Sequence, residues 1–398
     1  MKGKKNKIAV TLAGGGARGA YQAGVLRAIY EICKAKECPF GIISGVSAGS
    51  INGVALAAGA DDFDEATKLI WDTWQDLQID KIFKTDAVTL AKIGSAWAIN
   101  LTMGHILDRE ISTHLLDTSP LKKLLRAKID MERVKSNLHH GLLHGVALSA
   151  TDYHTGKSVT FFDGDRDIKE WDLNSGIGRR CSMKIDHIMA SSAIPIFFPP
   201  VRVEKSVYGD GGIALRSPLS PAIHLGAERI LIIGLEHPLE DEPSESCHRE
   251  EQIMMGDIIG TLLNALFLNS IVSDVARMDE TNNVVSIFNP EQLKSRKNHL
   301  RKLPFLFIRP SQDLAEIDQD QFNRFPFTLR HLLKGVGINS KKGWDFLGYL
   351  AFDRIYASKL LELGYKDGWK QKEKILEFFA GDEIYDEGGI TDQPPPVH

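Results

Sequence analysis

Within its first 60 residues the chain passes twice from a short apolar run, through a glycine-rich turn, into a segment with helical periodicity. The first passage contains "LAGGGARGAYQAGVL", residues 12–26, and the second contains "GVSAGSINGV", residues 45–54. Because the apolar runs at 7–13 and 39–45 are typical of buried strands, the order is strand, helix, strand, helix. This order predicts a parallel α/β sheet with both turns at one edge.

The glycines of the first turn fit two different chemistries. Gly14, Gly16 and Gly19 match the dinucleotide pattern G-x-G-x-x-G. That pattern also needs an acidic residue about 20 positions further on to bind the ribose hydroxyls. No carboxylate lies between Glu37 and Asp61, and no G-K-[ST] follows to make a P-loop. The sequence therefore argues against a nucleotide and leaves these glycines available to an oxyanion.

The second turn is a G-x-S-x-G pentapeptide placed between a predicted strand and a predicted helix. Its glycines, Gly45 and Gly49, relieve crowding in a sharp turn and expose the hydroxyl of Ser47 at the helix N-terminus. A packing loop of small residues is the alternative interpretation. The structural context favours a nucleophile elbow with Ser47 as the nucleophile.

A serine nucleophile needs donors for the oxyanion, and the "GGGARG" loop lies at the tip of the neighbouring strand. Backbone N–H groups of such a loop approach a tetrahedral oxygen closely, since glycine has no Cβ. The candidates are Gly14, Gly15, Gly16, Ala17, Arg18 and Gly19. The Arg18 side chain has two alternatives: it attracts a substrate phosphate, or it anchors the loop.

The nucleophile also needs a base, and "VYGDGGIALRSPL" supplies a candidate. Asp210 follows an extended run and precedes Gly211 and Gly212, which places a carboxylate on a tight turn at the edge of the sheet. An ordinary turn aspartate is the alternative. His224 and His237 follow in the order Ser, Asp, His, which leaves open a catalytic triad of the α/β-hydrolase type.

The rest of the chain divides into recognisable segments. We predict a catalytic α/β domain over 1–235 with a helical insertion at about 61–140, an acidic linker over 236–252, a mainly helical extension over 253–390 and a tail over 391–398. Within the extension we expect one long helix over 253–281, a strand at "PFLFIRP", and helices around 325–334, 341–363 and 369–380.

Bulk composition limits the partners and the compartment. A net charge of −4 and a pI near 6.4 give no electrostatic reason to expect nucleic acid. Four scattered cysteines favour a reducing compartment, so we expect a cytoplasmic protein. No window offers about 20 apolar residues, so membrane contact is expected to be peripheral.

Four motifs in order, "GGGARGAYQAGVL", "GVSAGSINGV", "ASSAIPIFFPPV" and "DGG", resemble the patatin-like phospholipase family over roughly residues 7–235. The resemblance implies a three-layer α/β/α sandwich around a central, mostly parallel sheet. It implies a catalytic dyad of Ser47 and Asp210, with the oxyanion hole formed by Gly14, Gly15, Gly16 and their neighbours. It also implies hydrolysis of lipid acyl esters, for which no metal and no cofactor is expected.

The chain departs from the family pattern after the DGG, where many relatives carry an asparagine. Here Arg216 and Ser217 precede Pro218, which puts local substrate contacts in doubt. The C-terminal part is similar to an extension seen in a bacterial subset of the family, and that likeness implies no chemistry.

We therefore expect a phospholipase A or lysophospholipase acting on phospholipid or another acyl-ester lipid. An acyltransferase using the same acyl-enzyme and a non-catalytic lipid-binding scaffold are the alternatives. The insertion is predicted to cover the acyl groove and face lipid, because it concentrates large apolar residues: Trp71, Trp74, Ile82, Phe83, Trp97 and Ile106. Simple packing of these residues on the sheet is the competing interpretation.

Overall fold

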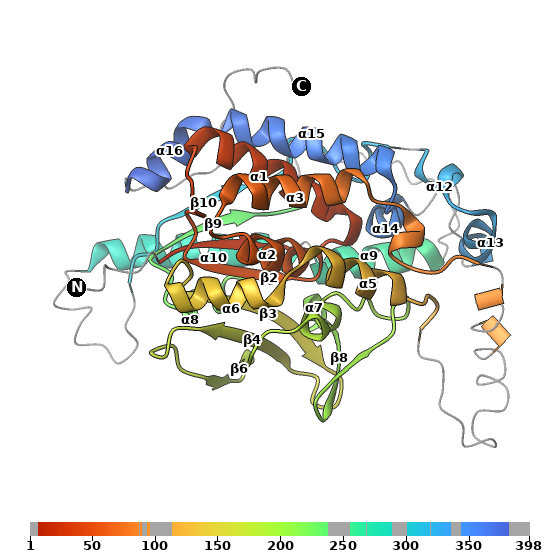
Figure 1. Ribbon diagram of the computed structural model, residues 1–398, viewed down its shortest axis with the longest axis horizontal. Helices are drawn as coiled ribbons and strands as arrows, with labels where there is room; N and C mark the ends of the chain where they lie inside the picture. The colour runs from red at the N-terminus through yellow and green to blue at the C-terminus, as the bar shows by residue number, and fades with distance from the viewer. Residues whose placement is uncertain are drawn as a thin grey trace.

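The protein is a mixed α/β structure built around a central, mostly parallel sheet (Figure 1), as the sequence predicted. The computed structural model describes residues 7–86, 88–89, 94–95, 114–237, 255–267, 269–288, 301–318, 320–335 and 344–381. The predicted tail lies outside these residues, as does the predicted linker apart from its first two positions.

The sheet brings together strands from both halves of the chain. In the described residues its strands are β1 (Ile8–Leu12), β2 (Ile42–Val46), β3 (Gly145–Asp152), β4 (Ser158–Gly164), β5 (Trp171–Leu173), β6 (Gly176–Arg180), β7 (Val201–Val203), β8 (Ser206–Asp210), β9 (Arg229–Ile233) and β10 (Phe305–Ile308). The main order is β10-β9-β1-β2-β3-β4-β6-β5, and the run from β10 to β3 is parallel. β8 pairs antiparallel with the end of β3, and β7 pairs with β8.

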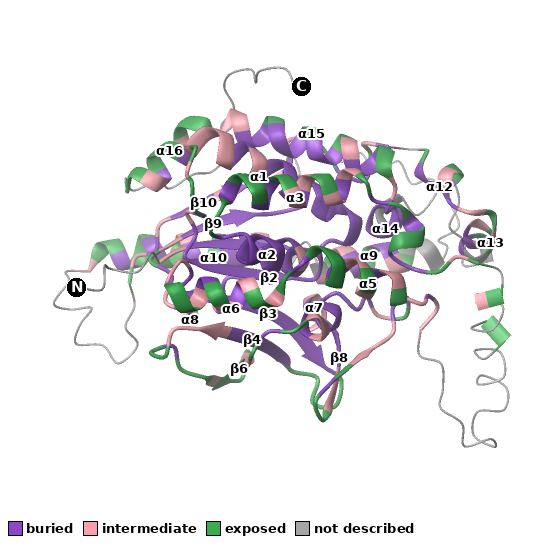
Figure 2. Cartoon of the chain, viewed as in Figure 1, coloured by how far each residue is buried: buried purple, intermediate pink, exposed green. Residues whose placement is uncertain are grey.

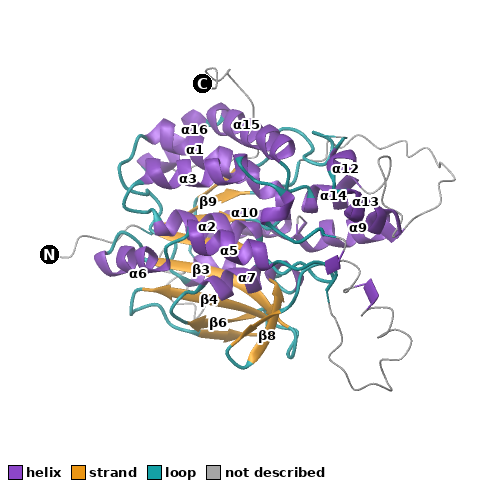
Figure 3. Ribbon diagram, turned by 45° about the vertical axis from the view of Figure 1, so that its right-hand side comes forward, coloured by secondary structure: helices purple, strands orange, loops and turns teal. Residues whose placement is uncertain are grey.

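Helices cover the sheet, whose central strands β2 and β3 are buried along their whole length (Figures 2 and 3). α2 and α8 both pack on β1, β2 and β3. The helices of the first part are α1 (Ala20–Cys33), α2 (Ala48–Ala58), α3 (Phe63–Gln75), α5 (Ser119–Lys128), α6 (Met131–His140), α7 (Ile185–Ser191) and α8 (Ser220–His224), with 3-10 turns η1 (Gly16–Gly19), η2 (Ile79–Lys81) and η3 (Gly211–Ile213). In its described residues the predicted insertion is helical, as α3, η2, α5 and α6 show.

The C-terminal extension shares the core of the catalytic part. Its helices are α9 (Met255–Phe267), α10 (Asn269–Ile287), α12 (Gln321–Arg324), α13 (Phe327–Gly335), α14 (Trp344–Leu350), α15 (Arg354–Lys370) and α16 (Lys372–Ala380). Its strand β10 pairs in parallel with β9, and buried residues of both parts form one apolar cluster.

The contact between α1 and α15 is close enough to bring their backbones together (Figure 1). A Cβ on Gly24 would lie 2.1 Å from the Leu361 carbonyl oxygen, and a Cβ on Gly364 would lie 2.0 Å from the Tyr21 carbonyl oxygen. The Tyr21 hydroxyl also donates to Asp367 Oδ2 at 3.2 Å. Only residues without a side chain permit this approach of the two helices.

The predicted single helix over 341–363 is wrong, because the chain breaks between α14 and α15. Asp353 is the N-cap of α15, and its carboxylate accepts from the N–H groups of Ile355 and Tyr356. A capping aspartate starts a new helix here. The long helix predicted over 253–281 corresponds to α9 and α10, and the residue between them lies outside the described residues.

By length and composition alone, the stretch Ile258–Ile287 in α9 and α10 could cross a membrane, with a mean hydropathy of 1.6. From the sequence we expected no such stretch. A third of its apolar window is buried inside the protein. Ile271, Val275 and Met278 belong to the shared core, so α10 serves this structure as a core helix.

Candidate active site

Ser47 occupies a strained turn between β2 and α2. It is the N-cap of α2, with φ 54° and ψ −127°, in the left-handed half of backbone space. The flanking glycines are required by close backbone contacts. A Cβ on Gly45 would lie 2.3 Å from the Gly49 carbonyl oxygen, and one on Gly49 would lie 2.2 Å from the Leu12 carbonyl oxygen. This geometry is that of a nucleophile elbow.

Ser47 and Asp210 are brought together although 163 residues separate them. The Ser47 hydroxyl donates to Asp210 Oδ2 at 2.6 Å, and the Gly212 N–H donates to Oδ1 at 2.9 Å. Asp210 is completely buried. Burial raises the pKa of its carboxyl to about 7, while the hydrogen bonds from Ser47 and Gly212 act in the opposite direction.

The backbones that carry these two groups are fixed by further hydrogen bonds. The Ser191 hydroxyl accepts from the Ser47 N–H at 3.0 Å and donates to the Ser149 carbonyl at 2.6 Å. The Asp210 N–H donates to the Ala193 carbonyl at 2.9 Å, and the Thr151 hydroxyl donates to the Asp210 carbonyl at 2.8 Å. The "ASSAIPIFFPPV" segment therefore connects the elbow to the aspartate, a role that the sequence analysis did not assign.

The glycine-rich loop lies against the elbow. Leu12 at the end of β1 pairs with Gly45 in β2, and Gly16 and Ser47 line the same groove. A Cβ on Gly19 would lie 2.9 Å from Ala48 Cβ. The Arg18 N–H donates to the Gly15 carbonyl within the loop at 3.2 Å. With the Arg18 N–H engaged there, the backbone N–H groups of Gly14, Gly15, Gly16, Ala17 and Gly19 stay candidates for an oxyanion hole.

Arg18 points into the protein, away from the groove. Its side chain is 2 % exposed, and its guanidinium lies 4.5 Å from the ring centre of Tyr349 in α14. A Cβ on Gly16, which has φ 58°, would lie 2.3 Å from the Tyr349 carbonyl oxygen. These contacts favour loop anchoring over phosphate binding, and the anchor is the C-terminal extension.

The loop after the DGG is also held by the extension. Asp274 in α10 is buried, accepts from the Ser217 hydroxyl at 2.8 Å and accepts from the Leu219 N–H at 2.9 Å. Burial raises the pKa of the Asp274 carboxyl. At the position where the chain departs from the family pattern, Ser217 thus connects the loop to a carboxylate 57 residues away.

The candidate histidines lie elsewhere in the protein. His224 stacks on Trp171 with ring centres 4.4 Å apart, and His237 Nδ1 is 3.0 Å from the Pro310 carbonyl oxygen. Over the ranges that the structure describes, the hydrogen bonds of the Asp210 carboxylate go to Ser47 and Gly212. The geometry gives no support to the triad.

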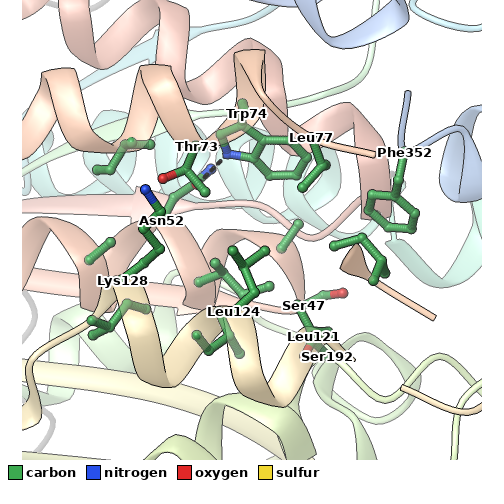
Figure 4. A pocket seen from close by; sticks show the side chains of 18 of the residues that line it. Ser47, Asn52, Thr73, Trp74, Leu77, Leu121, Leu124, Lys128, Ser192 and Phe352 are labelled. Atoms are coloured by element: carbon green, nitrogen blue, oxygen red, sulfur yellow. Dashed lines mark hydrogen bonds between the residues drawn. The ribbon is translucent and has the colours of Figure 1, made fainter. Parts of the chain in front are cut away.

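An apolar groove opens at Ser47, and the space in it together with its open mouth is about 750 Å³ (Figure 4). Gly16 and Ser47 mark its reactive end. Its other lining residues come from the insertion, α2, the segment after α7, and the extension: Ala48, Ile51, Asn52, Ala55, Leu69, Ile70, Thr73, Trp74, Leu77, Ile82, Leu121, Leu124, Leu125, Lys128, Ile129, Ser192, Ile194, Phe198 and Phe352. This wall suits an alkyl chain.

The large apolar residues of the insertion pack inward where the structure describes them. Trp74, Ile82 and Phe83 are buried, and the Trp74 indole N–H donates to Asn52 Oδ1 at 2.8 Å. Trp71 is half-buried, with its ring 6.1 Å from Tyr365. Trp97 and Ile106 lie outside the described residues. The described part of the insertion therefore builds a wall of the groove, and Trp74 belongs to that wall with only 6 % of its surface exposed.

One group of side chains has the chemistry of metal ligands, but it lies far from Ser47 in the sheet. Possible ligand atoms of His144, Asp165 and Asp167 all lie within 4.8 Å of one another. His144 Nδ1 is 3.1 Å from Asp165 Oδ2. His144 precedes β3 at the amino end of the parallel strands, whereas Ser47 follows β2 at their carboxyl end. The cluster cannot take part in chemistry at Ser47.

The fold and the site define an α/β protein with the geometry of a serine-nucleophile enzyme. The chain belongs to the patatin-like phospholipase family, whose model matches residues 10–223. The cGAMP-activated phospholipase of Pseudomonas aeruginosa (strain BWHPSA011 / Pa011) is 26% identical over 219 residues, which cover 55% of this chain and 56% of that relative. The chain thus spans about half the length of this curated relative.

Two solved structures are similar over most of the chain. VipD from Legionella pneumophila has a TM-score of 0.36 and 13% identity, covering 94% of this chain and 67% of that one. The type III effector protein ExoU has a TM-score of 0.29 and 13% identity, covering 91% and 54%.

Proposed function

We propose that this protein is a lipid acyl hydrolase of the phospholipase A or lysophospholipase type, which cleaves carboxylic esters through Ser47 and Asp210. The observation that carries the proposal is the 2.6 Å hydrogen bond from the Ser47 hydroxyl to a fully buried Asp210, at the mouth of an apolar groove. Membership of the patatin-like phospholipase family supports an ester-bonded lipid as substrate.

In the first half-reaction, Asp210 Oδ2 accepts the hydroxyl proton while Ser47 Oγ attacks the ester carbonyl carbon. The negative charge that develops on the carbonyl oxygen faces the N–H groups of the glycine-rich loop. When the tetrahedral intermediate collapses, the carbon–oxygen bond to the leaving alcohol breaks. That alcohol takes the proton from Asp210, and the acyl group stays on Ser47.

In the second half-reaction a water molecule replaces the alcohol. Asp210 accepts a proton from the water, whose oxygen attacks the acyl carbon. Collapse releases the fatty acid, and Ser47 recovers its proton from Asp210. The same carboxylate is base and acid in turn, which requires a pKa near the working pH. Burial supplies this by raising the pKa of Asp210 to about 7.

The substrate is expected to be met at a lipid surface, and we infer peripheral contact of a cytoplasmic protein with it. The apolar groove favours a lipid over a small soluble ester, because its wall consists mainly of aliphatic and aromatic side chains.

The test is a panel of diacyl phospholipids and lysophospholipids incubated with the purified protein and with Ser47→Ala, with products identified by mass spectrometry. Free fatty acid from the wild type alone is the expected result. Acyl transfer to an added alcohol without fatty acid release would show a transferase, and no reaction of any lipid would favour a scaffold. A fluorophosphonate should label Ser47, and labelling of another serine would overturn the assignment.

A further inference from the structure

The groove that begins at Ser47 is built from one face of each of three helices. From α2 and from α5 the contributing positions have the spacing i, i+3, i+4 and i+7, which places them in line on one helix face. They are Ala48, Ile51, Asn52 and Ala55 in α2, and Leu121, Leu124, Leu125 and Lys128 in α5. α3 closes the groove from above, with Trp74 and Thr73 labelled in Figure 4. Along this groove Ser47 lies at the N-terminus of α2 and Lys128 at the C-terminus of α5.

The length of the channel follows from the helix that forms its floor. Ser47 is the N-cap of α2, and Ala55 is eight residues further along the same helix. At about 1.5 Å of rise per residue this distance is about 12 Å, the length of roughly ten carbons in an extended alkyl chain.

Beyond Ala55, charged side chains join the apolar ones in the wall. A second hollow, of about 320 Å³, shares Ala55, Leu69 and Lys128 with the groove, and its wall also includes Glu65, Asp130 and Arg133. Arg133 is ion-paired there, 2.8 Å from Asp61 Oδ1 and 3.8 Å from Glu65 Oε2. The rest of this wall is small and apolar, formed by Ala58, Gly59 and Ala66. A methylene group that enters the hollow therefore lies beside charged groups as well as apolar ones, and it gains less from burial than one in the groove.

We propose that the groove seats a single acyl chain of about ten to twelve carbons and measures its length, with Ala55 and Lys128 as the end stop. The proposal rests on the function assigned to Ser47, and it adds the chain length that this site prefers. Acyl chains that are shorter leave part of the wall unfilled. Longer chains place their last carbons among the charges of Glu65, Asp130 and Arg133.

Alkyl fluorophosphonates with chains of 2 to 16 carbons test the length directly, because their reaction with Ser47 needs no turnover. The second-order labelling rate should rise about three- to fourfold for each added methylene that the groove buries. The rise should stop at about ten to twelve carbons. A rise that continues to 16 carbons, or a rate that does not depend on length, would overturn the proposal.

We call the chain length at which the labelling rate stops rising the break. Two variants should move this break in opposite directions. Ala55→Leu fills the end of the groove and should shift the break to shorter chains by about two to three carbons. Lys128→Met replaces a charged end with an apolar one and should shift the break to longer chains. Each shift is read from the ratio of rates within one variant, so a change in overall rate does not imitate it.

Ala127→Leu is the matched control, since Ala127 is exposed on α5 next to Lys128 and does not line the groove. Its break should coincide with that of the wild type. Unshifted breaks in both groove variants would overturn the length measurement, and Lys128→Met decides alone if Ala55→Leu does not fold. Absence of Ser47 labelling at every chain length would instead overturn the proposed function, so the two failures are distinguishable.

Discussion

The reactive end of the site and its apolar groove are built by different physical means. Around Ser47 and Asp210 the contacts are short and involve the backbone, from the carbonyl oxygens that leave no room for a Cβ at Gly45 and Gly49 to the hydrogen bond from the Gly212 N–H. The groove is formed by side chains on helix faces. Backbone contacts tolerate no substitution, whereas aliphatic side chains exchange for one another at modest cost. Substitutions at the reactive end should therefore abolish the reaction, whereas substitutions in the groove should change which substrates are preferred.

Among the substitutions that separate the two regions, removal of the nucleophile should have the largest effect. Ser47→Ala should lower kcat by at least about 10³-fold, because only binding and oxyanion stabilisation remain. The variant should fold normally, and its affinity for a non-reactive lipid analogue should stay close to that of the wild type. A loss of both kcat and lipid affinity would show that the two regions are not separable. Circular dichroism and steady-state kinetics measure these effects.

Asp210→Asn should lower kcat by roughly 10³-fold, since the amide cannot accept the serine proton. The same change should raise stability at high pH. The Asp210 carboxyl has a pKa of about 7 in the folded protein, raised from the ordinary 3.8. It therefore binds its proton more readily in the folded state, so stability falls as pH rises from about 4 to 7. Asn cannot lose a proton, so the variant should have the higher Tm at pH 8. An unchanged or lower Tm would contradict the burial argument.

The pH dependence of wild-type kcat/KM tests the role of Asp210 at the reactive end. Because Asp210 must be ionised to accept a proton, kcat/KM should rise about tenfold per pH unit below the pKa of about 7 and level off above it. His224→Ala and His237→Ala should keep the same profile, measured on a short soluble ester. A profile that changes in either histidine variant would restore the triad.

Asp274 supports the reactive end from the extension, since it holds the loop that follows Asp210. Asp274→Ala leaves the Leu219 N–H without this acceptor and should lower kcat by about tenfold, with destabilisation of about 1–3 kcal/mol. Arg277→Ala is the control, because Arg277 contacts Asp274 at 3.2 Å but is largely exposed; it should stay near wild type. A change confined to KM would place Asp274 with the groove.

The smallest effect belongs to the groove. Leu124→Ala enlarges the middle of the channel and should lower kcat/KM by about threefold to tenfold for a dodecanoyl ester, through lost contact with the chain. The acetyl ester should respond much less. Equal loss for both esters would mean that Leu124 supports the dyad.

The parts of the site that have a local signal could be predicted from the sequence. Ser47 and Asp210 each lie on a glycine-flanked turn after an apolar run. Ser191 and Asp274 have no such signal, because each acts through hydrogen bonds to residues far along the chain, at a separation of 144 residues for Ser47 and Ser191. A single polar residue does not indicate its distant partner.

The fold shows the same limit. Strands β1 and β2 were predicted because they are continuous apolar runs buried on both faces. The β5–β6 hairpin was missed, since residues such as Asp172 and Arg179 are exposed and interrupt any alternation. That the extension would add β10 to the sheet and place α15 on α1 could not be predicted, because the pairing depends on contacts over hundreds of residues.

The packing of α15 on α1 also has a consequence for synthesis of the chain. Tyr21 and Asp367 are 346 residues apart, and at about 5–20 residues per second a ribosome needs roughly 20 to 70 s to cover that distance. During this interval the nascent α1 has no partner for the surface that α15 later covers. Contacts of such high sequence separation slow folding and leave apolar surface open to aggregation. Production of the active protein should therefore depend on chaperone supply and on translation speed more than its single compact core suggests.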